Sequence, residues 1–249
     1  MKRKQLFILL AMFLGIVLML YAEFRLLETR RVHRESDAAY AALTAQVRAA
    51  EREEEKLSEE EGTGIPALNI DFVRLKEVNT AAAAWLFCPD TAIDYPVMRA
   101  HDYSYYLNHL PDGTPNKNGS LFIDYNNAPD FSQPLTVIYG HHMKSGKMFG
   151  SLKGYKNQGY YEQHPVMYLY TEAGAHRIDL LYGCVIGAKQ WREQGFMFAE
   201  NLPALLDWAA ASTTFQSRVA YDGKSRIVAL STCSYEFDSA RYVMIEILH

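Results

Sequence analysis

Three kinds of side chain in this sequence could together carry out nucleophilic chemistry on a carbonyl group. Cys233 lies in the stretch LSTCSYEF, and Arg241 follows it eight positions later. A thiolate attacks a carbonyl carbon, but it needs a basic partner and a hydrogen-bond donor for the oxyanion that forms. The stretch VIYGHHM supplies His141 and His142 as bases, and the guanidinium of Arg241 is a forked donor. A cysteine-histidine-arginine site for acyl transfer is therefore one hypothesis for this chain.

The same residues have a simpler interpretation, in which Cys233 is buried, the histidines are solvated and Arg241 lies on the surface. The chain has three cysteines, and an odd number leaves at least one thiol free. No C-x-x-C pair occurs, which disfavours a zinc knuckle or a thioredoxin-type redox motif. Cys88 and Cys184 stand beside apolar residues, so we expect them to be buried as small hydrophobic side chains. On residue types alone, the simpler interpretation is the default.

Short strands are expected to position the candidate residues. Seven segments after Pro89 are rich in Val, Ile, Leu and Tyr, with turn clusters such as PDGTPNKNG and EAGA between them. These segments are AIDYPVMR, SLFIDY, LTVIYGHH, VMYLYT, HRIDLLYGCVIG, RIVALSTC and RYVMIEIL. About seven or eight strands in roughly 180 residues predict a mainly β domain, either a closed barrel or a sandwich.

The candidate residues fall at the ends of three of these strands. Gly140 is expected to end the strand that precedes His141 and His142, and Cys233 ends the next-to-last strand. Arg241 begins the last strand after the seven-residue loop SYEFDSA, so its side chain and that of Cys233 can face one cleft. Because side chains alternate in direction along a strand, we expect at most one of the two histidines in that cleft.

Two helices are expected within the same domain. Residues 69–86, NIDFVRLKEVNTAAAAWL, place apolar residues from Phe72 to Ala82 at helical spacing, which predicts an opening helix. Residues 200–212, ENLPALLDWAAAS, have a proline in the first turn and several large apolar residues, which predicts a helix inserted between two strands.

The N-terminus carries the strongest topological signal. Residues 6–22 are uncharged and mostly apolar, near the lower length limit for a membrane-spanning helix, and they follow the basic stretch MKRK. A cleaved signal peptide is the alternative, but bulky Leu20 and Tyr21 stand where a cleavage site would require small residues. We therefore predict an uncleaved single-pass anchor, with residues 1–5 in the cytoplasm and the folded domain on the extracellular face.

A charged segment separates the expected anchor from the folded domain. Residues 23–66 are rich in Ala, Glu and Arg, which favours a helix, but their apolar side chains are small and few. We predict a solvated helical stalk, with a membrane-proximal coiled coil as the alternative. The breaker cluster EGTGIP at residues 61–66 marks the boundary, so residues 67–249 form the predicted folded domain.

Composition and charge argue against a nucleic-acid partner. The chain has 249 residues, of which 49% are hydrophobic and 22% are charged, as expected for one good-sized globular core. The net charge of −4 and the pI near 6.1 give no electrostatic footprint for nucleic acid, and we expect no such partner.

Six short stretches occur in the order WLFCPDTAIDYPVM, YYLNHL, GSLFIDY, YGHHM, MFGSLKGY and LSTC. With the N-terminal anchor and the arginine beyond the cysteine, they resemble the class B sortases, which are membrane-anchored cysteine transpeptidases. The resemblance runs from about residue 69 to residue 248 and implies a closed sortase-type β-barrel of about eight strands, with an N-terminal helix and an inserted helix. Each stretch is short, but their common order makes the resemblance specific.

The resemblance implies a role for each candidate residue. Cys233 matches the family nucleophile, His141 the histidine after the glycine, and Arg241 the arginine of the closing strands. His142 occupies a variable position and is treated as a neighbour. No metal and no organic cofactor are implied.

The residues before the nucleophile are the implied substrate-binding residues, namely Ser231 and Thr232. The usual family pattern there is T-L-x-T-C, whereas this chain has ALSTC, so Ala229 lacks the hydroxyl of the first threonine. Since Ala229 is expected to point the same way as Ser231 and Cys233, the departure bears on substrate fit.

The implied reaction is transpeptidation. The Cys233 thiolate attacks a backbone carbonyl in the C-terminal sorting signal of another exported protein and forms a thioester. His141 protonates the leaving amine and then deprotonates an incoming amine, while Arg241 donates hydrogen bonds to the oxyanion. The implied acceptor is an amine of cell-wall peptidoglycan or of its lipid-linked precursor, and the anchor contacts membrane lipid.

Three other functions stay open at this point. A cysteine endopeptidase would use the same residues with water as the acceptor. A pilin-polymerising sortase often carries an Asp-Pro-aromatic lid motif, and this chain contains no Asp-Pro pair. A non-enzymatic, membrane-tethered interaction domain would leave the Cys233 thiol inert.

Overall fold

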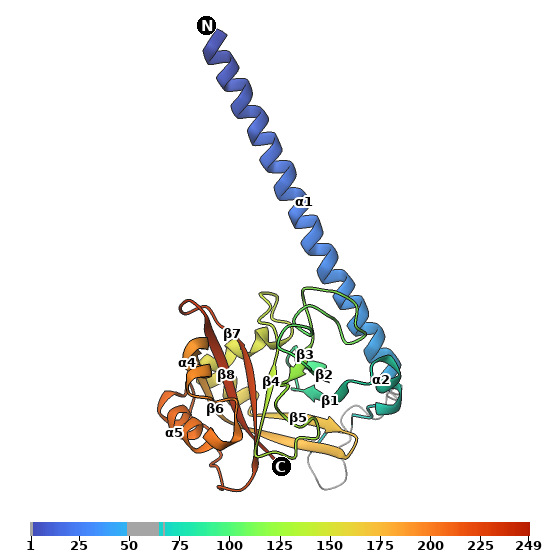
Figure 1. Cartoon of the computed structure of the whole chain (residues 1–249), viewed down its shortest axis with the longest axis vertical. Helices are drawn as coiled ribbons and strands as arrows, with labels where there is room; N and C mark the ends of the chain where they lie inside the picture. The colour runs from blue at the N-terminus through green and yellow to red at the C-terminus, as the bar shows by residue number, and fades with distance from the viewer. Residues whose placement is uncertain (1, 49–64, 67) are drawn as a thin grey trace.

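The computed structural model describes residues 2–48, 65–66 and 68–249 and contains one closed barrel of eight strands (Figure 1). The strands are β1 (Ala82–Phe87), β2 (Asp94–Arg99), β3 (Leu121–Ile123), β4 (Leu135–Tyr139), β5 (Val166–Thr171), β6 (Gly174–Gly187), β7 (Arg226–Cys233) and β8 (Ala240–Leu248). Around the barrel they follow the order β1-β2-β3-β4-β7-β8-β6-β5, and β5 pairs with β1 to close it. The predicted closed barrel is confirmed.

Most neighbouring strands are antiparallel, but β2 pairs with β3 and β4 pairs with β7 in parallel. The parallel pair of β4 and β7 requires a long crossover connection. As a result, the segment after β4, which carries both candidate histidines, lies beside the end of β7, which carries Cys233.

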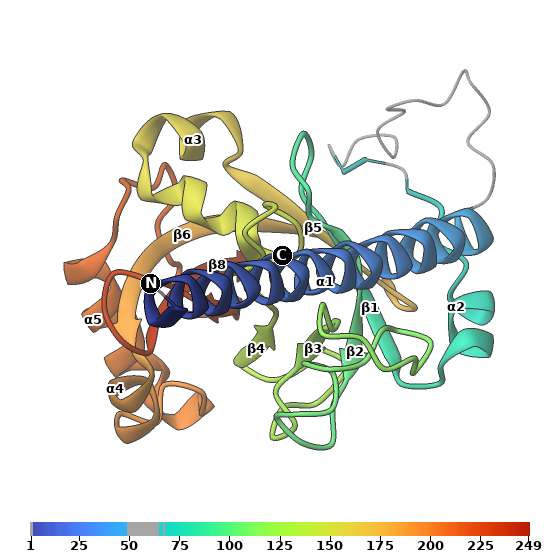
Figure 2. The ribbon, with the colours of Figure 1, turned by 90° about the horizontal axis from the view of Figure 1, so that it is seen from above.

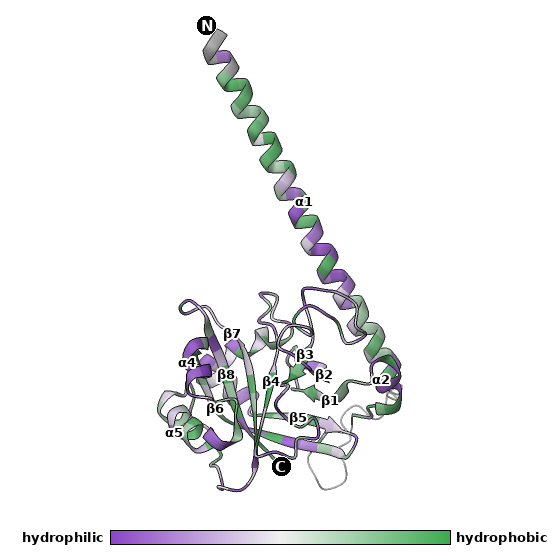
Figure 3. Ribbon diagram, in the orientation of Figure 1, coloured by the Kyte–Doolittle hydropathy of each residue, from purple (hydrophilic) through white to green (hydrophobic). Residues whose placement is uncertain are grey.

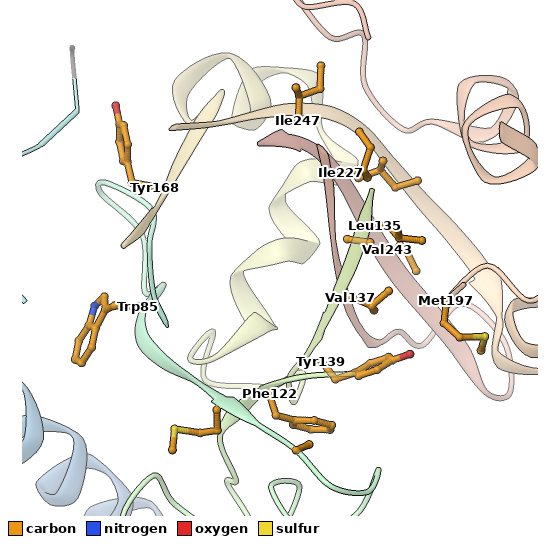
Figure 4. Packing of buried hydrophobic residues seen from close by; sticks show 14 of the residues in the cluster. Trp85, Phe122, Leu135, Val137, Tyr139, Tyr168, Met197, Ile227, Val243 and Ile247 are labelled. Atoms are coloured by element: carbon orange, nitrogen blue, oxygen red, sulfur yellow. The ribbon is translucent and has the colours of Figure 1, made fainter. Parts of the chain in front are cut away.

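Side chains alternate between the inside of the barrel and its outer surface. The inside is filled by residues such as Val97, Leu121 and Met244, all fully buried. The outer surface is also apolar, and Figure 4 shows Trp85 and Ile247 pointing away from the barrel centre. Because both faces of the strands are apolar, helices and loops must cover the outside.

The covering helices lie on two sides of the barrel, with α2 on one side and α4 and α5 on the other (Figure 2). They are α2 (Phe72–Val78), α4 (Ala188–Glu193), η2 (Ala199–Asn201) and α5 (Leu202–Ser212). The helices η1 (Phe149–Lys156) and α3 (Gln158–Gln163) instead bury side chains among the residues that fill the inside of the barrel. The helix α5 confirms the predicted insertion between strands, and it buries Leu205 and Ala209 against the barrel.

The predicted opening helix over residues 69–86 is wrong in its second half. The helix α2 begins after Asp71, whose side chain accepts a hydrogen bond from the backbone N–H of Arg74 at 3.0 Å. It ends before Asn79, and Ala82–Phe87 is the strand β1. Trp85 is fully buried there, so pairing with β2 and β5 overrides the helix propensity of the alanine run.

One long helix, α1 (Lys2–Val47), precedes the barrel and contains all of residues 6–22. Within the described part of the chain, it is the single helix long and apolar enough to cross a membrane. Its hydrophobic stretch lies in the part that projects away from the barrel (Figure 3), and none of that stretch is buried. This is the geometry expected of a membrane anchor.

The C-terminal end of α1 is helical, as expected, but it is not solvated. Although the predicted stalk contains few large apolar residues, two of them, Leu43 and Val47, are buried against the domain. The Tyr40 hydroxyl donates a hydrogen bond to the Gly119 carbonyl at 2.8 Å, and Asp37 forms an ion pair with Lys147. These contacts hold α1 against two loops of the domain. Residues 49–64, with most of the expected breaker cluster, lie outside the described residues, so the predicted domain boundary stays a prediction.

Candidate active site

Cys233 and Arg241 are direct cross-strand partners at the open ends of β7 and β8. Cys233 is exposed, whereas Cys88 and Cys184 are buried and free, as expected. Burial raises the pKa of the Cys88 thiol to about 11 and that of the Cys184 thiol to about 12. Since the thiolate is the nucleophile, the two buried cysteines are poor candidates and Cys233 is the accessible one.

A groove of about 260 Å³ brings the main candidate residues together. We call it the thiol groove, and its lining residues are Tyr103, Leu107, Phe122, Tyr139, Gly140, His141, Trp191, Arg192, Met197, Ser231, Cys233 and Arg241. Figure 4 shows Phe122 and Tyr139 on neighbouring strands and Met197 on a segment outside the barrel wall. The lining is aromatic and apolar around a few polar groups, which is typical of a ligand-binding site.

His141 reaches the groove because of the parallel pairing between β4 and β7. Tyr139 of β4 pairs with Ser231 of β7. Two positions further along the two parallel segments stand His141 and Cys233. The Gly140 N–H donates to the Ser231 carbonyl at 3.2 Å, which keeps the two segments together beyond the last strand pair. A Cβ atom at Gly140 would lie 2.3 Å from a side-chain carbon of Leu121, so only glycine fits at this position.

The imidazole of His141 is oriented by a backbone carbonyl. Its Nε2 atom lies 2.7 Å from the Leu107 carbonyl oxygen. Because a carbonyl oxygen can only accept, Nε2 carries the hydrogen in this arrangement, and Nδ1 of the neutral ring is left as the proton acceptor. Leu107 lies in the loop between β2 and β3, and sequence reasoning gave it no role.

The guanidinium of Arg241 lies 5.8 Å from the ring centre of Tyr139 and donates a hydrogen bond to the Ser231 hydroxyl at 3.4 Å. It forms no ion pair with a carboxylate of residues 2–48, 65–66 or 68–249. Its donors therefore stay available for an oxygen atom that gains negative charge in the groove.

The two residues before Cys233 differ in their surroundings. Ser231 lines the thiol groove, whereas Thr232 points to the other side of the strand and donates a hydrogen bond to the Gly140 carbonyl at 2.8 Å. Thr232 thus ties β7 to the segment that carries His141. Ala229 is fully buried and lies outside the groove lining, so its missing hydroxyl is not on the groove surface.

His142 points away from the thiol groove and contacts the backbone of Cys233. Its Nδ1 atom lies 2.9 Å from the Cys233 carbonyl oxygen, and its ring packs edge-on against Tyr235. Burial lowers the pKa of His142 below its usual value of 6.5, and the charges of Lys153 and Lys156 lower it further. The ring is therefore mainly neutral at pH 7 and donates its Nδ1–H to Cys233.

A buried carboxylate holds two tyrosines of the groove. Asp124, which follows β3, accepts hydrogen bonds from Tyr139 at 3.0 Å and from Tyr103 at 3.1 Å. Burial and the nearby Asp124 charge raise the pKa of both phenols. The sequence places Asp124 at the end of the strand SLFIDY, the same kind of position that singled out Cys233, but its role was not predicted.

Known proteins with similar sequences decide the family. Sortase B of Listeria monocytogenes is 32% identical over 174 residues, which cover 69% of this chain and 70% of that protein. The chain belongs to the sortase B family. Sortase B of Staphylococcus aureus is 26% identical over 177 residues, covering 70% of this chain and 72% of that protein. No protein-family model matches the chain.

Solved structures agree with this assignment to sortase B. A Bacillus anthracis protein similar to sortase B superposes with a TM-score of 0.70 at 25% identity, covering 86% of this chain and 96% of that one. Sortase B of Clostridium perfringens superposes with a TM-score of 0.66 at 25% identity, covering 72% of this chain and 99% of that one. The resemblance to class B sortases is confirmed, and the chain is a sortase, a cysteine transpeptidase.

Proposed function

We propose that Cys233, His141 and Arg241 are the catalytic residues of this sortase. One observation carries the proposal: the single exposed cysteine of the chain shares one groove with an oriented histidine and with an arginine that has no carboxylate partner among the described residues. Each of the three groups supplies one requirement of acyl transfer, namely the nucleophile, the proton carrier and the oxyanion donor.

In the first half-reaction the Cys233 thiolate attacks a backbone carbonyl carbon of the sorting signal. A C–S bond forms, and the carbonyl oxygen becomes an oxyanion that accepts hydrogen bonds from Arg241. The tetrahedral intermediate collapses as the peptide C–N bond breaks. The leaving nitrogen takes from Nδ1 of His141 the proton that this atom accepted from the Cys233 thiol when the thiolate formed, and the released segment departs with a new amino terminus.

In the second half-reaction an amine replaces the sulfur. The amine nitrogen forms a bond to the thioester carbon, and its proton passes to His141. The C–S bond then breaks, and the Cys233 thiolate is released. The product carries a new amide bond, so the free energy of the cleaved peptide bond is conserved through the thioester.

The thiol groove suits the sorting signal of an exported protein. Its aromatic lining can hold apolar side chains of an extended peptide, and Ser231 offers a hydroxyl next to the nucleophile. One solved structure holds sortase B in complex with triglycine, and another holds sortase B of S. aureus with a substrate. By analogy, the acceptor of this chain is an amine of peptidoglycan or of its lipid-linked precursor.

The long helix α1 suits a tether to the same membrane that holds the substrate. We infer a single-pass protein whose barrel lies on the extracellular face, where it meets sorting signals after export. Protease added to intact protoplasts should then degrade the barrel, and complete protection would contradict this orientation.

The reaction itself is tested with the full-length protein in detergent, a peptide carrying a sorting signal, and triglycine. We expect a product in which the peptide is joined to triglycine. Release of only the hydrolysed peptide at saturating triglycine would indicate an endopeptidase instead.

A further inference from the structure

A second pocket lies beside Cys233 and shares no lining residue with the thiol groove. It has a volume of about 410 Å³. We call it the lysine pocket, and its lining residues are His142, Lys144, Lys153, Lys156, Tyr235 and Glu236. His141 lines the thiol groove and the next residue, His142, lines the lysine pocket, so adjacent histidines separate the two.

The lysine pocket is connected directly to the backbone of the nucleophile. His142 is hydrogen-bonded to the Cys233 carbonyl at 2.9 Å. Tyr235 and Glu236 follow Cys233 by two and three positions, and Lys156 donates a hydrogen bond to the Ser234 hydroxyl at 3.0 Å. A molecule in this pocket therefore lies beside the backbone of Cys233 without entering the groove that holds the peptide.

The pocket carries more positive than negative charge. Lys156 forms an ion pair with Glu236, but Lys144 and Lys153 have no carboxylate partner in the part of the chain that the structure describes. The neutral His142 ring adds no charge. Two unmatched ammonium groups thus face a concave surface beside the reacting cysteine.

We propose that the lysine pocket binds the carboxylate of the incoming amine acceptor. This rests on the proposed function, because only a thioester enzyme needs an acceptor here. The peptide acyl group fills the thiol groove in the thioester state, so the amine must approach from outside it. Positive charge attracts a carboxylate and, at the same time, favours the free amine over its ammonium form. Only the free amine has the lone pair that attacks the thioester.

The carboxylate is bound but not changed in this step. The acceptor nitrogen forms the C–N bond, the C–S bond breaks, and the proton of the amine goes to His141. The lysine pocket acts only on acceptor affinity and amine protonation, so its loss should affect the second half-reaction and spare the first.

Triglycine and triglycine amide provide the test, since they share an amine and differ in the carboxylate. The full-length protein in detergent is supplied with a sorting peptide, and aminolysis is measured against acceptor concentration. In the Lys144→Gln/Lys153→Gln protein we expect the KM for triglycine to rise about three- to tenfold. The KM for triglycine amide and the rate of thioester formation should change less than about twofold.

The matched control is Lys117→Gln/Lys224→Gln, which removes the same charge from exposed positions outside both pockets. It should leave both KM values unchanged. Equal effects of the pocket variant on triglycine and its amide would overturn the proposal. A second result would also overturn it: inorganic pyrophosphate inhibits aminolysis, while triglycine is not preferred over triglycine amide. The pocket would then recognise phosphate.

Failure of the proposed function has a different signature, because the wild-type protein would then form no thioester at all. Binding is therefore also measured on the Cys233→Ala protein, which needs no first half-reaction. Triglycine should shift the NMR signals of the His142 ring more strongly than triglycine amide does. Equal shifts with both compounds would reject carboxylate recognition whatever the fate of the thioester.

Discussion

Cys233 and Arg241 face each other across the last strand pair of the barrel. Their separation is set by backbone hydrogen bonding between β7 and β8 and not by the conformation of the loop that joins them. The Ser231 hydroxyl and the Tyr139 ring further restrict the guanidinium. The proposed oxyanion donor is thus held in place before substrate binds, which is the condition under which such donors contribute most.

Arg241→Lys should keep the positive charge and the fold yet lose turnover. A lysine ammonium is a flexible point donor and does not reproduce the planar fork of the guanidinium. We expect kcat to fall about 10²- to 10³-fold, or roughly 3–4 kcal/mol, with a smaller change in peptide affinity. Arg218→Lys, at an exposed position outside the groove, is the control and should behave as wild type. Wild-type turnover in Arg241→Lys would mean that the arginine serves only as a general charge.

His141→Ala should remove most of the activity, with a loss of about 10²- to 10⁴-fold in the rate of thioester formation. His142→Ala should lose far less in this step, because its ring contacts the Cys233 backbone and lies outside the thiol groove. Stopped-flow measurement with a sorting peptide compares the two directly. An inactive His142→Ala protein beside an active His141→Ala protein would reverse the assignment.

The sequence was sufficient for the barrel and for the main groups of the groove, since the strand segments and the order of the motifs are local signals. Ala82–Phe87 was missed because an alanine-rich run favours a helix in isolation, and only pairing with β2 and β5 makes it a strand. The docking of Leu43 and Val47 and the support of Tyr139 by Asp124 depend on contacts between distant segments. No local pattern encodes such contacts, so they required the structure.

The barrel interior contains a carboxyl group that should make stability depend on pH. Glu246 is fully buried, and neither carboxyl oxygen has a hydrogen-bond partner among the described residues. Burial raises its pKa well above the usual 4.5, so the folded state holds the proton that the unfolded state releases. The contribution of Glu246 to the free energy of unfolding should therefore be most favourable below about pH 4.5. It should fall by up to about 1.4 kcal/mol per pH unit as the pH rises toward the folded-state pKa.

Glu246→Gln should abolish that slope, and Glu246→Met should also raise the melting temperature at pH 7, because it replaces a buried polar group by an apolar one. Denaturant unfolding between about pH 4.5 and pH 8 measures both effects. A wild-type slope retained in Glu246→Gln would show that other groups cause the pH dependence.

The docked end of α1 should stabilise the domain. Burial of Leu43 and Val47 contributes roughly 3–6 kcal/mol as an upper estimate. A version of the chain that begins at Glu23 keeps this end of the helix, and a version that begins at Ile65 lacks it. We expect the shorter version to be soluble but to melt at least several degrees lower. Thioester formation should also slow, since Asp37 no longer holds Lys147 in the loop after His141. Identical melting temperatures would show that the docking is energetically neutral.

Intact-mass spectrometry of the full-length protein mixed with a sorting peptide, without an amine acceptor, tests the central claim most directly. The wild-type, Cys88→Ala and Cys184→Ala proteins should each gain the mass of the acyl fragment, and the Cys233→Ala protein should gain none. The adduct should disappear on addition of triglycine, with the peptide joined to it. An acyl adduct on the Cys233→Ala protein, or full turnover by it, would contradict the account.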